Sequence, residues 1–218
     1  MKKIGIIHTS FVSVNDLIDL FTEIIPDAQL TNLVDDSFLR EVMANGGITP
    51  EIIKRMCSYV QMLEVSGVDA IFNQCSSVGE AFDIAIKQTN LPTLKVDQAM
   101  AEKAVELGSR IAVVATVAST LNPSCNLIIN TAKKAGKKVE VIPELVDGAL
   151  DVLMKENNRE KHNKMVRGKI EQLDGKVDVI VLAQGSMIVL LPELGNIKTP
   201  VLSSPRLGVQ KMREIIGL

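Results

Sequence analysis

Short apolar runs alternate with amphipathic stretches along the whole chain. The first run, residues 3–7, consists mainly of branched apolar residues, which is typical of a strand buried in a parallel sheet. From Leu17 to Ile25 the apolar residues recur at helical spacing, and Pro26 ends this stretch. The same alternation predicts further strands at 29–34, 68–73, 92–96, 111–115, 138–142, 177–182 and 201–203, further helices at 50–67, 80–88, 97–107, 122–136 and 205–216, and two helical stretches ending at 173.

Two of the predicted helices have clear start signals. Thr49 is a good N-cap in front of Pro50, which suits the first helical position. Asn122 and Pro123 form the same kind of start for a helix that ends at Gly136. Because strands alternate with helices throughout, we expect an α/β fold with parallel sheets covered on both faces.

The pattern of the first half returns in the second. Three segments recur at offsets of 107 (110 − 3), 109 (177 − 68) and 108 (199 − 91) residues. The recurrence could alternatively reflect the general similarity of all strand–helix units. The nearly constant offset favours two similar Rossmann-like halves, related by a pseudo-two-fold axis, with a cleft between them. We expect the first half to comprise 1–98 with 205–218, and the second half 99–204.

Composition excludes several classes of function. The net charge is −2 and aromatic residues make up only 3%, so a nucleic-acid partner is not expected. No apolar run is long enough to span a bilayer, and residues 4–7 are too short for a signal-peptide core. We expect a cytoplasmic protein without membrane contact. Three scattered cysteines and two distant histidines predict neither a disulfide framework nor a metal site.

The densest polar cluster, residues 73–80, joins a predicted strand to a predicted helix and contains Cys75, Ser76 and Ser77. A thiol at a helix start is near N–H groups that favour the thiolate. The two serines offer hydroxyl and N–H groups suited to a carboxylate. A small buried cysteine beside an ordinary serine cap is the alternative interpretation.

At the offset of 109 residues, Cys75 corresponds to Gln184 (184 − 75). Both follow a strand end, where open α/β sheets bind ligands, so we expect them on opposite walls of the cleft. Gln184 cannot transfer protons at neutral pH, but it can donate and accept hydrogen bonds. The other polar groups at such strand–helix junctions are expected to bind substrate: Thr9, Ser10, Ser76, Ser77, Thr116, Thr120, Gly185 and Ser186.

The remaining histidines and cysteines carry weaker signals. His8 lies at the end of the first strand and is a candidate catalytic residue, although a structural role is the alternative. Cys57 and Cys125 are expected to pack in the protein core. His162 lies among lysine, arginine and asparagine residues and is expected to be solvated.

The chain resembles the Asp/Glu racemase superfamily over its whole length. The resemblance rests on the duplicated halves and on Cys75-Ser76-Ser77, where the family has Cys-Asn-Thr. It rests also on Ala115-Thr116, which open the second half, and on residues 182–185, Leu-Ala-Gln-Gly, where racemases have Leu-Gly-Cys-Thr. Segments 35–37, 46–50 and 204–206, with Arg40, are similar to one particular branch of this superfamily.

The resemblance implies a PLP-independent racemase or isomerase of amino acid metabolism that needs no cofactor. In the family, one cysteine removes the proton alpha to a carboxylate and another reprotonates the opposite face. Such a site must stabilise an enolate-like state and hold its bases within reach. Here Gln184 replaces the second cysteine, which argues against two-base racemisation.

Three reactions remain open for a single thiol. Cys75 could protonate an enediolate left by decarboxylation or another C–C cleavage, or it could add to the substrate as a nucleophile while Gln184 orients that substrate. His8, which aligns with the racemase acid near the first strand, could instead act as the second base. A non-catalytic module that binds a small acid is the alternative function.

Two further expectations concern partners. Lysine and arginine are absent from the candidate site segments, which favours a small, modestly charged, carboxylate-bearing substrate. A dinucleotide is not expected, because the first strand–helix turn lacks a Gly-x-Gly-x-x-Gly fingerprint. We expect a homodimer, the commonest assembly of such proteins.

Overall fold

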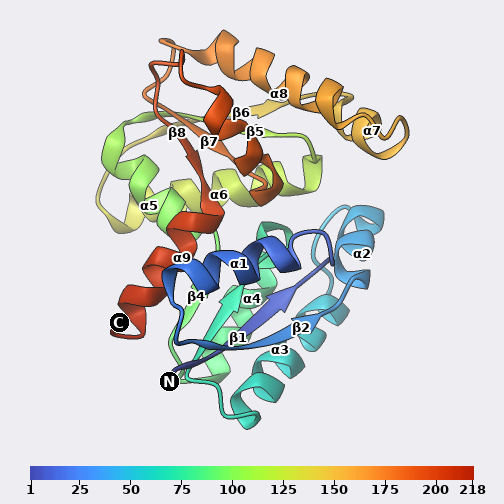
Figure 1. Cartoon of the computed structure of the whole chain (residues 1–218), viewed down its shortest axis with the longest axis vertical. Helices are drawn as coiled ribbons and strands as arrows, with labels where there is room; N and C mark the ends of the chain where they lie inside the picture. Colours follow the sequence, from blue (N-terminus) through green and yellow to red (C-terminus); the bar gives the residue numbers. More distant parts are fainter. The chain divides into compact units, whose positions relative to one another are not determined.

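The computed structural model describes residues 1–218. The chain divides into two compact units: a first unit of Met1–Val96 with Pro205–Leu218, and a second unit of Asp97–Ser204. Each unit is a four-stranded parallel sheet between two layers of helices (Figure 1). The predicted α/β fold with two similar halves is confirmed, and all eight predicted strands are present.

In the first unit the strand order is β2-β1-β3-β4, and α1 and α9 lie side by side on one face (Figure 1). The other face packs against α2, α3 and α4. Its strands are β1 (Lys3–His8), β2 (Gln29–Val34), β3 (Ala70–Asn73) and β4 (Thr93–Lys95). Its helices are α1 (Val14–Ile24), α2 (Ser37–Asn45), α3 (Pro50–Val65), α4 (Gly79–Ala85) and α9 (Ser204–Ile215), with 3-10 turns η1 (Ser76–Val78) and η2 (Ile86–Gln88).

Alternation along the strands builds a separate core on each face of this sheet. Ile4 and Ile6 of β1 pack with Phe21 of α1 in one cluster. Ile7, which points the other way, packs with Met56 of α3 in a second cluster. Both faces of the sheet are therefore buried, as the apolar strand sequences predict.

In the second unit the strand order is β6-β5-β7-β8, and α7 and α8 pack on one face together with the 3-10 segment η3. α5 and α6 pack against the sheet and against each other. The strands are β5 (Arg110–Ala115), β6 (Glu140–Leu145), β7 (Val179–Leu182) and β8 (Val201–Ser203). The helices are α5 (Gln98–Leu107), α6 (Ala118–Lys134), α7 (Ala149–Met154) and α8 (Arg159–Leu173), and η3 is Gly185–Glu193.

The register of strand pairing reproduces the sequence repeat. Ile4 pairs with Ala70 in the first sheet, and Ile111 pairs with Val179 in the second. The positions differ by 107 (111 − 4) and 109 (179 − 70), the offsets found in the sequence. The two sheets are therefore equivalent residue by residue, which allows each position in one unit to be compared with its counterpart in the other.

Each sheet's last strand leads into a helix that belongs to the other unit. α5 follows β4 but packs in the second unit, and α9 follows β8 but packs in the first. The approach of α9 to its sheet requires Gly208, because a Cβ atom there would lie only 2.6 Å from the carbonyl oxygen of Val96. A larger residue would therefore push α9 away from the end of β4.

Some predicted boundaries are wrong. α6 begins at Ala118 rather than at Asn122, and Pro123 lies inside the helix, where it removes one backbone hydrogen bond. The buried residues of α6 extend from Thr120 to Ala132, so packing against the sheet outweighs the proline. The helix α2 and the 3-10 segment η3 were not predicted from the sequence at all.

Three further side chains, all outside the candidate site, had a predicted environment: His162, Cys57 and Cys125. His162 is buried in α8, with only 6% of its surface exposed, so the expectation of a solvated histidine is wrong. Its ring Nδ1 lies 3.0 Å from Oδ1 of Asn163. Cys57 packs against the core of the first unit, as expected. Cys125 is half-buried, and burial raises the pKa of its thiol. No helix in the chain combines the length and the apolar character that a membrane span requires.

Candidate functional site

Cys75 and Gln184 occupy equivalent positions at the carboxyl ends of β3 and β7. Their backbone angles are nearly the same, with φ and ψ of −120° and 120° at Cys75 and of −121° and 131° at Gln184. In each unit the N–H of the residue before this position donates to a carbonyl oxygen of the neighbouring strand. Gln74 donates to Ile7 over 3.0 Å, and Ala183 donates to Val114 over 2.9 Å. The two side chains therefore leave the same kind of turn in their respective sheets. That they face one another across a cleft stays a prediction.

Hydrogen-bond donors surround the sulfur of Cys75, a half-buried residue. The hydroxyl groups of Thr9 and Ser77 and the N–H groups of Ser77 and Val78 all point toward it. These donors favour the thiolate, as the strand–helix junction suggested. Burial nevertheless has the larger effect and raises the pKa of the Cys75 thiol. Burial therefore favours the neutral thiol, which fits the alternative interpretation of a small buried cysteine, while the surrounding donors act in the direction expected of the strand–helix junction.

Two amide side chains support the Cys75 turn. Nδ2 of Asn73 donates to the carbonyl oxygen of Cys75 over 2.9 Å. Nε2 of Gln74 donates over 2.6 Å to the hydroxyl of Ser13, the residue before α1. The turn is thus connected both to its own strand and to the loop that follows β1.

Gln184 is held by a single residue through two hydrogen bonds. Its Oε1 accepts from the backbone N–H of Thr116 over 2.9 Å, and its Nε2 donates to the Thr116 hydroxyl, also over 2.9 Å. One N–H and one lone pair of the amide remain available, as does the Thr116 hydroxyl proton. Thr116 is the counterpart of Thr9 (116 − 9 = 107), so each unit pairs a threonine after its first strand with the residue after its third.

His8 has a different environment from Cys75. It is fully buried, and its Nε2 lies 2.9 Å from Oδ1 of Asn32 on β2. Burial lowers the pKa of the ring, so the neutral imidazole is favoured. Alternation along β1 places His8 on the same side of the sheet as Ile6, whereas Cys75 packs against the cluster on the other side. No hydrogen bond joins His8 to Cys75, and its role as a second base stays a prediction.

The remaining predicted residues lie on the segments that follow the strand ends of the two sheets. Ser10 and Ser76 are half-buried, whereas Thr120 is buried in the first turns of α6. Gly185 begins η3, and Ser186 is exposed beside it. The structure thus brings Thr9 and Ser77 to Cys75, and Thr116 to Gln184. Asn73 and Val78 were missed as separate contributors, although both belong to the polar cluster recognised in the sequence.

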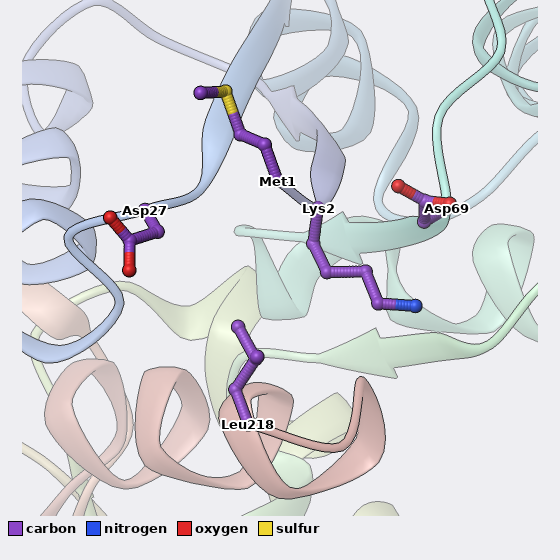
Figure 2. Close-up of a pocket in the computed structure, with 5 residues that line it drawn as sticks. All are labelled: Met1, Lys2, Asp27, Asp69 and Leu218. Carbon is purple, nitrogen blue, oxygen red and sulfur yellow. The ribbon is translucent and has the colours of Figure 1, made fainter.

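A surface pocket of about 520 Å³ lies at the opposite end of the first sheet (Figure 2). Its lining residues lie before the strands or at the two ends of the chain: Met1, Lys2, Asp27, Asp69 and Leu218. The Asp69 carboxylate accepts from the backbone N–H of Lys3 over 2.7 Å, and the counterpart Asp178 bonds Arg110 in the same way over 2.8 Å. Because this carboxylate has an equivalent backbone partner in both units, Asp69 has a structural role at the start of its strand.

Comparison with solved structures identifies the fold. A candidate Asp/Glu racemase from Yersinia pestis superposes with a TM-score of 0.78 at 16% identity, covering 99% of each chain. Aspartate racemase from Picrophilus torridus gives a TM-score of 0.73 at 16% identity, over 100% of this chain and 95% of that one. Glutamate racemase from Aquifex pyrophilus gives 0.68 at 18% identity, over 97% and 83%.

Comparison with functionally curated proteins gave no match. The family model described as Asp/Glu/Hydantoin racemase matches residues 7–212. This range includes both strand-end turns, with Cys75 in the first unit and Gln184 in the second. The family and the fold together support a racemase-type function on a small acid or amino acid. The chain belongs to the Asp/Glu/hydantoin racemase family.

Proposed function

We propose that this protein is a racemase-type enzyme that transfers a proton on one face only of the carbon alpha to a carboxylate. The substrate is a small acid or amino acid, and no cofactor takes part. Cys75 is the proton-transfer group. The observation that supports the proposal is the pairing of equivalent positions, with a thiol in one unit and a non-titrating amide in the other.

Cys75 acts as an acid toward an enediolate, whose carbon receives its electron pair when a C–C bond of the substrate breaks, as when a malonate loses carbon dioxide. A raised pKa keeps its proton at neutral pH, so the neutral thiol can protonate an enediolate carbon. The S–H bond breaks, a C–H bond forms, and the sulfur is left as a thiolate. The hydroxyls of Thr9 and Ser77 and the two N–H groups then stabilise that anion until it takes up a proton again. In the reverse direction the thiolate removes the same proton.

Gln184 orients the substrate rather than transferring a proton. Its two bonds to Thr116 hold the amide in one orientation and leave one N–H free to donate. A donor held in this way suits a carboxylate or an enediolate oxygen, because it needs no reorganisation during the reaction. Without a second proton-transfer group, the α carbon is expected to exchange or gain its proton on one face only, so that a single enantiomer is formed.

Hydrogen–deuterium exchange tests this proposal directly. The wild-type protein would be incubated in deuterated buffer with a panel of amino acids, hydroxy acids, malonates and maleate. Mass spectrometry would follow deuterium at the α carbon, and chiral chromatography would follow configuration. We expect deuterium incorporation on at least one compound, with a single enantiomer as product, and loss of the reaction in Cys75→Ala and Cys75→Ser.

Cys125→Ser is the matched control, because it removes a half-buried thiol outside the candidate site. It should keep the wild-type rate. Full turnover in Cys75→Ser would refute the role of the thiol. Equal racemisation of both enantiomers by the wild type would refute proton transfer on one face.

A second candidate function has one specific observation in its favour. A neutral, unactivated thiol suits a module that binds a small acid without chemistry, and burial does keep Cys75 in that form. The same panel separates the two functions. Saturable ligand binding in calorimetry, with no deuterium exchange on any ligand, would support the binding module.

A further inference from the structure

Polar groups support the strand ends in the first unit, whereas apolar residues occupy the equivalent positions in the second. Asn73 corresponds to Leu182, since they pair with Ile7 and Val114 in their respective sheets. Asp35 corresponds to Val146, because their N–H groups donate to His8 over 3.0 Å and to Ala115 over 2.8 Å. The second unit shows that the fold itself needs no carboxylate at this position. Only the first unit, which carries the thiol, therefore has polar side chains at these two positions.

Asp35 is the centre of that arrangement. Its Oδ1 accepts from the N–H of Ser37 over 3.0 Å and from the Ser37 hydroxyl over 2.6 Å. Its Oδ2 accepts from Nη1 of Arg55 over 3.1 Å and from the hydroxyl of Tyr59 over 2.7 Å. Burial opposes ionisation of this carboxyl, but the four bonds together outweigh burial and hold the pKa of Asp35 below its ordinary value. Both carboxylate oxygens are thus used to connect α2 to α3.

Arg55 strengthens the connection on the α2 side. Its Nη1 also donates to the Ser37 hydroxyl over 2.8 Å, and its Nη2 donates to Glu41 one turn further along α2. The guanidinium carbon lies 4.6 Å from the ring centre of Phe38, a cation–π contact. The first two turns of α2 are therefore attached to α3 by charge, hydrogen bonds and an aromatic ring.

α2 in turn packs against η1, the turn that follows Cys75. Phe38 and Val42 belong to the same core cluster as Val78, and Cys75 packs against that cluster. The N–H groups of Ser77 and Val78 in η1 point toward the Cys75 sulfur. A displacement of α2 would therefore reach the thiol through a single layer of contacts.

We propose that Asp35, with Arg55 and Tyr59, positions α2 against the η1 turn and thereby limits the access of water to the Cys75 sulfur and keeps it correctly oriented. These three are positioning residues, because they act through α2 and not on the substrate. The inference rests on the proposed function, in which Cys75 is the reacting group. It adds three residues of the first unit that control the state of that thiol.

Alkylation of Cys75 tests the inference without a substrate. Iodoacetamide labelling of wild type, Asp35→Asn and Tyr59→Phe would be followed across neutral and alkaline pH, with peptide mass spectrometry reporting on Cys75 alone. A loosened α2 should admit water to the thiol, so its apparent pKa should fall. A fall of about 0.5 raises the thiolate fraction about threefold near neutral pH. We expect this effect in Asp35→Asn and a smaller one in Tyr59→Phe.

Glu23→Gln is the matched control. Glu23 also pairs with an arginine, Arg206, over 2.8 Å, but it lies on α1 on the other face of the sheet. Its labelling profile should equal that of the wild type. If Asp35→Asn lowers the melting temperature and leaves the Cys75 profile unchanged or shifted to higher pH, the inference is overturned.

If Asp35→Asn does not fold, Tyr59→Phe decides alone by the same criterion, since it removes one hydrogen bond only. A lack of turnover in the deuterium assay would refute the proposed function but would not affect these labelling results.

Discussion

Replacing Gln184 by cysteine should convert one-sided proton transfer into racemisation. The substitution places a second thiol at the position equivalent to Cys75, on a turn with nearly the same backbone angles. Thr116 would offer its N–H and hydroxyl to the new sulfur, as Thr9 offers its hydroxyl to Cys75. On the proposed function, the second unit would thereby acquire the second proton-transfer group that two-base chemistry requires.

The structure sets the expected magnitudes. The variant loses two hydrogen bonds of ordinary length at a half-exposed side chain, which costs about 1–2 kcal/mol in the free energy of unfolding. For a chain of this size, that corresponds to a fall of about 2–8 °C in melting temperature. A positioned acid or base contributes about 10²–10⁴-fold to proton transfer. We expect the ratio of racemisation to same-face exchange to rise by about 10²-fold, the lower end of this range, because the groups around residue 184 are not adapted to a thiol.

Chiral chromatography in deuterated buffer measures this ratio on the compound that the wild type turns over best. Gln184→Ser is the matched control, because it removes the same two bonds without adding a thiol; it should lose stability and gain no racemisation. Labelling would first establish that the introduced thiol is reduced and accessible. If Gln184→Cys then exchanges deuterium as fast as the wild type but still yields a single enantiomer, the reasoning is refuted.

Three further predictions concern stability and ionisation. Burial lowers the pKa of His8 from 6.5, so below about pH 6.5 the unfolded chain takes up this proton before the folded chain does. The free energy of unfolding should therefore decrease by up to about 1.4 kcal/mol for each unit by which the pH falls. His8→Asn should remove this pH dependence in chemical denaturation. Tyr59 is the chain's single tyrosine, and burial together with the Asp35 hydrogen bond raises its pKa to about 12. A rapid absorbance titration should detect this raised pKa, and Asp35→Asn should lower it. Gly208→Ala should cost about 1–3 kcal/mol through the clash with a backbone carbonyl, whereas Gly168→Ala, in open space within α8, should be neutral or stabilising in the same thermal assay.

The sequence predicts the strands of this protein well, since buried parallel strands have a distinct composition. It fails at two elements for different reasons. η3 is apolar on most sides, so it has no helical stripe that could be recognised. α2 does have an apolar face, with Phe38 and Val42 one turn apart, but this short pattern was overlooked in the sequence. The start of α6 was misplaced because a proline normally marks a helix start, and here tertiary packing carries the helix through Pro123.

The central residues of the candidate site were predictable because they depend only on position along the chain. Their hydrogen-bond partners were not, because those partners lie on neighbouring strands. The offset alone paired Cys75 with Gln184. The threonine partner of each comes from the adjacent strand in the sheet, and strand order is not written in the offset. The ionisation of Cys75 was left open, because the effect of nearby N–H groups can be inferred from a motif but the extent of burial cannot.

The division of the first unit between two distant segments of the chain has a consequence for biosynthesis. Residues 97–204 are contiguous and carry a complete sheet with its helices, so the second unit can fold as it leaves the ribosome. Residues 1–96 must wait for α9, whose Val209 and Met212 fill the same core cluster as Phe21. Until α9 has been synthesised, α1 alone packs on that face of the sheet, so part of the apolar surface is exposed to chaperones and to aggregation during this interval.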